Sequence, residues 1–170
     1  LPICAARTVA GSMFFNQGES CNAPSHVLVQ ASVADEFVQL VAAEAPKYAA
    51  GDPLNPATEL GALVDAGQLK TVLGYIEAGH AEGGRCVTGG RQVRQETGGY
   101  YVEPTLIQTD DPGYRSLCEE IFGPVLTAYV YPDAKWAETL ALVDRTSPYA
   151  LTGSIFARRS EEHTSELQSL

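Results

Sequence analysis

Long apolar runs are missing from this chain of 170 residues, and none approaches the ~18 apolar residues that suggest a membrane-spanning helix. Basic residues are scarce, since 11 Lys and Arg stand against 21 Asp and Glu and the net charge is −10. Nucleic acids and anionic membrane surfaces are bound by clustered positive charge, so the composition argues against both as partners. A hydrophobic content of 45% is typical of an ordinary globular domain with a real core.

Paired cysteines are also missing. The four cysteines form no C-x-x-C pair and have no neighbouring set of His or acidic ligands: Cys4, Cys21, Cys86 and Cys118. We therefore expect neither a metal site nor a disulfide framework, and we expect a reducing, cytoplasmic location. Residues 1–15 are mildly apolar but lack a basic start and contain Arg7, so they do not form a signal peptide.

Strand-like runs alternate with amphipathic stretches of helical period. We expect strands at 27–30, 85–88, 98–107 (interrupted at Pro104), 125–131 and 151–157, and helices at 5–15, 32–46, 66–82 and 133–145. Ser32 and Asp133 are the expected N-caps of two of these helices. The alternation predicts an α/β fold of three layers, with a mainly parallel sheet and flanking helices.

One thiol stands between a helical stretch and a strand. Residues 14–24 read FFNQGESCNAP, an apolar segment followed by a polar turn that contains Gly18 and Cys21. A thiol in such a turn can be reached by a substrate, as a cysteine nucleophile requires. Free cysteine is also among the most buried residue types, so inert packing is the alternative for Cys21.

Two motifs carry a family resemblance. The NQGxxC pattern resembles the catalytic cysteine loop of the NAD(P)-dependent aldehyde dehydrogenase superfamily, and EEIFGPV at 119–125 resembles the second signature of that family. They lie about a hundred residues apart, in the family's order. The resemblance extends over roughly residues 5–158. It implies that residues 1–158 are a partial catalytic, cysteine-bearing domain that uses NAD or NADP, in a parent protein that is a homo-oligomer.

The resemblance implies roles for five residues. Cys21 is the nucleophile, and Ser20 and Asn22 line the aldehyde pocket. The carboxylate of Glu120 holds the nicotinamide ribose hydroxyls, a task that suits a group accepting from two vicinal donors. Phe122 packs against the nicotinamide ring. Cys21 would add to the aldehyde, and its own backbone N–H would be one of two oxyanion donors.

Neighbouring residues have simpler expected roles. Glu19 stands where the family more often has Gln, and we expect it to point away from the thiol, because an acid there would disfavour the thiolate. Gly61-Ala62-Leu63-Val64 matches another family element, which we interpret as a structural turn without chemistry.

Other parts of the family pattern are not in this sequence. The general base glutamate, the oxyanion asparagine and the nucleotide-binding domain belong before Leu1, and a Pro-Phe-Gly-Gly segment and an oligomerisation strand belong after the last residue. We therefore expect the 170-residue chain alone to be inactive, and poorly soluble through unpaired sheet edges. Residues 159–170 break the pattern and resemble a translated sequencing adaptor, so we interpret them as a foreign or disordered tail.

The substrate prediction depends on which part of the chain is compared. Residues 114–158, with YVYPDAKW and LVDRTSPYALTG, are most similar to L-glutamate γ-semialdehyde (1-pyrroline-5-carboxylate) dehydrogenases, which implies proline catabolism. Residues 12–107 are closer to general or amino-aldehyde dehydrogenases. This difference suggests that two related reading frames are joined near residue 108.

Two functions of other classes stay open. The chain could be a cysteine hydrolase that uses Cys21 with His26, or a non-catalytic α/β domain used for assembly. Glu119 and Glu120 could be a solvated acidic pair, and Phe122 could be a core side chain. Cys118, directly before the acidic pair, is expected to be packed rather than reactive.

Overall fold

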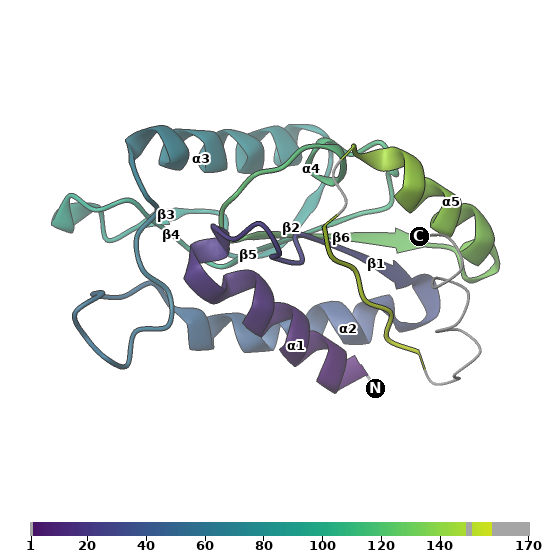
Figure 1. Cartoon of the computed structure of the whole chain (residues 1–170), viewed down its shortest axis with the longest axis horizontal. Helices are drawn as coiled ribbons and strands as arrows, with labels where there is room; N and C mark the ends of the chain where they lie inside the picture. Colours follow the sequence, from purple (N-terminus) through teal and green to yellow (C-terminus); the bar gives the residue numbers. More distant parts are fainter. Residues whose placement is uncertain (1, 149–150, 158–170) are drawn as a thin grey trace.

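A four-stranded sheet lies between two layers of helices in the computed structural model, which describes residues 2–148 and 151–157 (Figure 1). On one side are the helices α1 (Pro2–Phe14) and α2 (Ala31–Glu44). On the other are α3 (Ala66–Ala81), α4 (Arg115–Cys118) and α5 (Trp136–Thr146). Short 3-10 turns adjoin these elements: η1 (Phe15–Gly18), η2 (Ala45–Tyr48), η3 (Gln95–Thr97) and η4 (Asp133–Lys135). The predicted three-layer α/β fold is confirmed.

The sheet has the order β1-β6-β5-β2 and is mainly parallel. Strands β1 (His26–Gln30) and β5 (Thr105–Thr109) both run parallel to β6 (Val125–Tyr131), whereas β2 (Arg85–Thr88) runs antiparallel to β5. A separate antiparallel ribbon is formed by β3 (Gln92–Val93) and β4 (Tyr101–Val102). Pro104 separates β4 from β5, as the sequence predicted.

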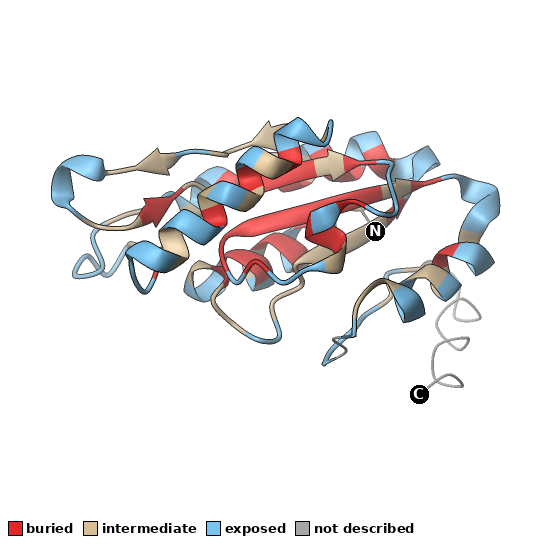
Figure 2. Cartoon of the chain, turned by 90° about the horizontal axis from the view of Figure 1, so that it is seen from above, coloured by how far each residue is buried: buried red, intermediate tan, exposed pale blue. Residues whose placement is uncertain are grey.

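The two central strands divide the interior into two hydrophobic clusters. Leu106 and Leu126 pack toward α1 and α2, whereas Ile107 and Val125 pack toward α3. Side chains of a strand alternate between the two faces of a sheet, so strands covered on both faces carry apolar residues on both. Figure 2 shows the resulting buried stripe along the middle of the molecule.

Helix α3 begins and ends where its sequence signals lie. Asp65 precedes the helix, and its Oδ1 accepts a hydrogen bond from the backbone N–H of Gln68 (2.8 Å). Val72 and Ile76 are buried against the sheet. Gly83, with φ +85°, follows the last turn, in the left-handed conformation that favours glycine at a helix end.

The cap predicted for α2 is wrong. Gln30, not Ser32, precedes this helix, and Ser32 lies inside its first turn. The backbone N–H of Ser32 donates to Asp133 Oδ1 (3.0 Å), which comes from the connection after β6. Asp133 itself starts η4 and does not cap α5, because α5 begins only at Trp136. The carboxylate expected to cap α5 therefore accepts a hydrogen bond from the first turn of α2 instead.

The strand predicted at 151–157 is also wrong. These residues have no strand conformation, and Leu151 and Phe156 are 66% and 40% exposed. A run with strand propensity forms a strand only where a neighbour pairs with it, and within the described residues the sheet ends at β1 and β2. The proposed tail, residues 159–170, lies outside the described residues.

Within 2–148 and 151–157, no helix combines the length and the apolar character needed to cross a membrane. The predicted junction near residue 108 falls inside β5, which pairs with β6 on one side and with β2 on the other.

Candidate active site

The cysteine loop (residues 15–25) connects α1 to β1 through an unusual backbone. Asn16, Gln17 and Gly18 have φ values of 48°, 59° and 69°, so three successive residues are left-handed. This conformation costs an L-residue about 1–2 kcal/mol, and such strain concentrates at functional sites. The turn is closed by two hydrogen bonds, from Asn16 Nδ2 to the Glu19 carbonyl and from the Glu19 N–H to the Asn16 carbonyl (both 2.9 Å).

Cys21 lies at the tip of this loop and is exposed. Its neighbours are joined across it, because Ser20 Oγ donates to Asn22 Oδ1 (2.7 Å). Among the hydrogen bonds of the described residues, none uses the backbone N–H of Cys21. The loop therefore presents a thiol together with a free backbone donor.

The acidic loop (residues 119–124) follows α4 and treats its two glutamates differently. Glu119 accepts hydrogen bonds from Tyr75 Oη (2.6 Å) and Arg115 Nε (3.2 Å). The bond from Tyr75 and then that from Arg115 lower the pKa of Glu119. Glu120 is exposed, and its carboxylate has no partner within the described part of the chain. Phe122 is 40% exposed and left-handed, with φ +57°.

Two glycines bring the two loops together. A Cβ on Gly18 would lie 2.3 Å from the carbonyl oxygen of Gly123. A Cβ on Gly123 would lie 2.4 Å from Cγ2 of Val72, on α3. The acidic loop is therefore fitted between the cysteine loop and α3 with no room for a side chain. The structure thus places the two family motifs in contact, although about a hundred residues separate them.

A third segment, residues 60–68, joins both loops. With the Gln17 amide oriented to satisfy both its groups, Gln17 Oε1 accepts from the Gly61 N–H (2.8 Å). The Val64 N–H donates to Glu19 Oε1 (3.1 Å). Gln68 Nε2 donates to the carbonyls of Ile121 (2.8 Å) and Phe122 (2.7 Å). The sequence showed only that 61–64 matches a family element and did not reveal its partners.

The carboxylate of Glu19 is turned to this third segment. Burial raises the pKa of Glu19, the hydrogen bond from Val64 opposes the shift, and the negative charge of Asp65 adds to it. The carboxylate is thus held at the start of α3 by a backbone donor.

His26 lies in β1, partly buried, and pairs in register with Thr127 of β6. Burial lowers the pKa of His26, and a hydrogen bond to the backbone of Ser116 opposes this. No hydrogen bond joins His26 to Cys21 among the described residues, so nothing in the geometry supports a Cys–His pair. Cys118 ends α4 and is partly buried.

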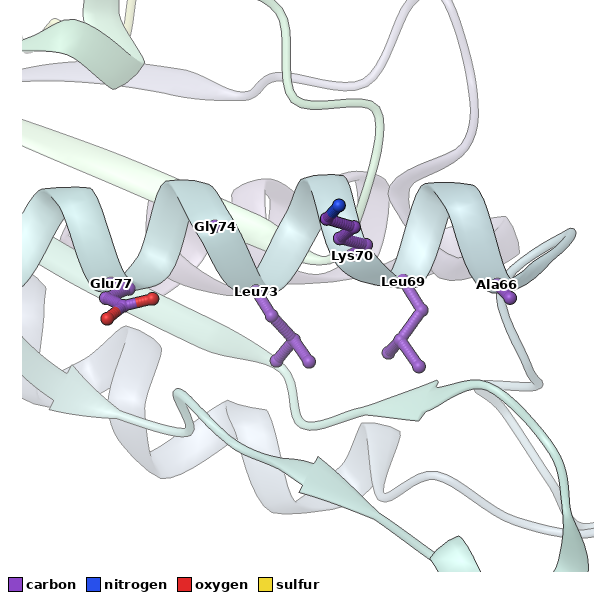
Figure 3. Close-up of a pocket in the computed structure, with 6 residues that line it drawn as sticks. All are labelled: Ala66, Leu69, Lys70, Leu73, Gly74 and Glu77. Atoms are coloured by element: carbon purple, nitrogen blue, oxygen red, sulfur yellow. The ribbon is translucent and has the colours of Figure 1, made fainter.

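Two surface hollows lie elsewhere. The first, about 400 Å³, runs along α3, where Leu69 and Leu73 point to the same side (Figure 3). The second, about 300 Å³, lies between η2 and the β2–β3 turn, and Arg94 and Glu103 contribute to its wall. Neither is lined by Cys21, Glu120 or Phe122. Within the described residues no group of His, Cys, Asp and Glu side chains could hold a metal ion.

Comparison with known proteins gives consistent matches. Residues 4–169 match the model of the aldehyde dehydrogenase family. The mitochondrial delta-1-pyrroline-5-carboxylate dehydrogenase of Dictyostelium discoideum is 38% identical over 151 residues, which are 85% of this chain and 26% of that protein.

Solved structures agree with this result. Gamma-glutamyl-gamma-aminobutyraldehyde dehydrogenase from Burkholderia cenocepacia is 46% identical with a TM-score of 0.80, over 86% of this chain and 29% of that one. Indole-3-acetaldehyde dehydrogenase of P. syringae, in complex with NAD+ and IAA, is 39% identical with a TM-score of 0.92, over 99% and 33%. The chain thus spans between a quarter and a third of the length of these proteins.

Proposed function

The chain belongs to the aldehyde dehydrogenase family, and from that premise we propose that it supplies the nucleophile and part of the cofactor site of an NAD(P)-dependent enzyme that oxidises an aldehyde to a carboxylic acid. One observation carries the proposal. The loop that exposes Cys21 touches, through Gly18 and Gly123, the loop that carries Glu120 and Phe122.

The chemistry begins at Cys21. Its thiolate forms a bond to the aldehyde carbon, and the carbonyl oxygen becomes an alkoxide that can accept from the free Cys21 N–H. When bound, NAD(P)+ accepts the hydride that leaves the tetrahedral carbon. This leaves a thioester on Cys21, and water cleaves it to the acid and the free thiol. Ser20 and Asn22, bonded to each other, border the position of the aldehyde.

Glu120 and Phe122 fit the cofactor role because both side chains are accessible to a ligand. The Glu120 carboxylate has no partner among the described residues, so both its oxygens are available to vicinal ribose hydroxyls. Phe122 is 40% exposed, so its side chain is accessible to a planar ring. A solved relative of this fold, the P. syringae enzyme, is named as a complex with NAD+.

For the substrate we propose L-glutamate γ-semialdehyde, in proline catabolism. The name of the Dictyostelium relative and the similarity of residues 114–158 to that branch support this choice. An amino-aldehyde is the second candidate, favoured by the name of the Burkholderia structure. The ratio of kcat/KM for the two aldehydes distinguishes them.

We also propose that the active protein is a longer homo-oligomer, and that these 170 residues alone do not turn over an aldehyde. The short share of each relative that the chain covers supports this, as does the absence of Cys21 from the lining of the two hollows. Four free thiols suit the reducing cytoplasm, although the Dictyostelium relative is named as mitochondrial.

The test measures formation of reduced cofactor by the full-length protein that contains this segment. We expect Cys21→Ala to lower kcat by about a thousand-fold or more, as loss of a nucleophile does in other enzymes. Cys4→Ala is the matched control, because Cys4 is also exposed, and should retain the wild-type rate within about two-fold. Retained turnover in Cys21→Ala would refute the proposal.

A further inference from the structure

One side chain bonds to the backbone of the acidic loop at two successive positions. Gln68 Nε2 donates to the Ile121 carbonyl at 2.8 Å and to the Phe122 carbonyl at 2.7 Å. A primary amide nitrogen carries two hydrogens, so one group can serve both acceptors. Gln68 is 53 and 54 residues away from its two partners in the sequence.

The left-handed backbone of Phe122 needs an interaction that stabilises it. Phe122 has φ +57°, in the region that costs a residue with a side chain about 1–2 kcal/mol. The residue is 40% exposed, so packing alone does not fix its side chain. Among the described residues, no other group bonds to the carbonyls of Ile121 and Phe122. The contact of Gly123 with Val72 restrains only the following residue.

Gln68 is itself fixed in place. It lies in the first turn of α3, where its backbone N–H donates to Asp65 Oδ1 (2.8 Å). The helix is anchored by Val72 and Ile76, which are 0% and 3% exposed. Just upstream, the Val64 N–H holds Glu19 of the cysteine loop (3.1 Å). The start of α3 therefore holds the cysteine loop and the acidic loop at the same time.

We infer that Gln68 is a positioning residue for the cofactor site: it holds the left-handed Phe122 and thereby the direction of the Phe122 ring and of the neighbouring Glu120. The inference rests on the proposed function, since it assumes that these two residues meet the cofactor. It assigns to Gln68 an action through the loop backbone and no part in the transfer of hydride or proton.

The test compares Gln68→Met with wild type in the full-length protein. Methionine has a similar length and a good helix propensity but no N–H donor. We expect hydrogen exchange in a peptide covering 119–125 to rise several-fold, and the KM for the cofactor to rise about ten-fold with kcat changed less than two-fold. Gln39→Met, on the exposed face of α2, is the matched control and should change neither quantity.

A second variant tests the direction of the hydrogen bonds. Gln68→Glu keeps the shape but turns an acceptor toward two carbonyls, so it should raise the cofactor KM more than Gln68→Met does. The reverse order would overturn the inference, as would a Gln68→Met protein with unchanged exchange or unchanged KM. A wild-type protein without cofactor-dependent turnover would instead refute the proposed function, and the inference with it.

Discussion

Gly18 is the residue at which the two motifs meet. The sequence predicted a reachable thiol and an acidic motif, since both have local patterns. It did not predict that Gly18 would face Gly123 at a distance that excludes a methyl group, nor that Gln68 would bond to Phe122. Contacts between residues more than fifty positions apart leave no periodic signal in the chain.

Substitution of Gly18 should show both reasons why this position requires glycine: its left-handed backbone and the lack of room for a side chain. Gly18→Ala adds a left-handed alanine and a clash with a backbone oxygen 2.3 Å away, and should lower the unfolding free energy by about 3 kcal/mol. Gly98→Ala is the control, because Gly98 also has a positive φ (+75°) but nothing within 4 Å, and should cost about 1 kcal/mol. Urea denaturation measures both. Equal losses would show that the loops do not touch.

Among the elements, α3 and α2 show what a sequence can and cannot reveal. Asp65 and Gly83 mark the ends of α3, and the helix predicted at 66–82 is observed at Ala66–Ala81. The start of α2 is served by Asp133, 101 residues away, so the nearby Ser32 was misread as its cap. A cap taken from another connection can be recognised only after the fold is known.

The hydrogen bond from the Ser32 N–H to Asp133 can be tested by substitution. Asp133→Ala should lower the unfolding free energy by about 0.5–2 kcal/mol, because the Ser32 N–H loses its acceptor. Asp133→Asn keeps an acceptor oxygen and should lose less. Asp144→Ala changes an exposed aspartate of α5 and serves as the control. If Asp133→Ala costs no more than Asp144→Ala in thermal or urea unfolding, the cap has no energetic role.

His26, in strand β1, should make the free energy of unfolding depend on pH. Burial lowers the pKa of His26 in the folded state, so the unfolded chain, with a His pKa of about 6.5, binds the proton more readily. The resulting stability is complete above pH ~6.5 and is lost as the pH falls through that value toward the lower folded pKa.

His26→Gln should therefore reduce the fall in unfolding free energy between about pH 7.5 and pH 5. Chemical denaturation at a series of pH values measures this fall. His80→Gln removes a histidine from an exposed position on α3 and is the comparison. If both substitutions reduce the pH dependence of the unfolding free energy equally, a specific effect of His26 is contradicted.

At the scale of the whole molecule, the alternation of strands and helices was enough to predict three layers and a mainly parallel sheet. It could not predict that β2 runs antiparallel, because a strand's direction depends on the path of the Gly83-Gly84 turn that precedes it. The strand expected at 151–157 failed because propensity does not specify a pairing partner.

The sheet edges lead to a prediction for these 170 residues expressed alone. Within the described residues β1 and β2 each have one unpaired side, and open edges favour association between chains. We expect aggregation or mixed oligomers in size-exclusion chromatography with light scattering. A monodisperse monomer that melts cooperatively would contradict this.

The most direct test of the account is to locate the acyl group during turnover. The full-length protein is mixed with aldehyde and cofactor, quenched in acid, and digested for mass spectrometry. The account predicts the mass of the acyl group on the peptide that contains Cys21, dependent on the cofactor and absent in Cys21→Ala. An acyl group found on Cys4, Cys86 or Cys118 instead, or continued turnover with Cys21 never modified, would contradict it.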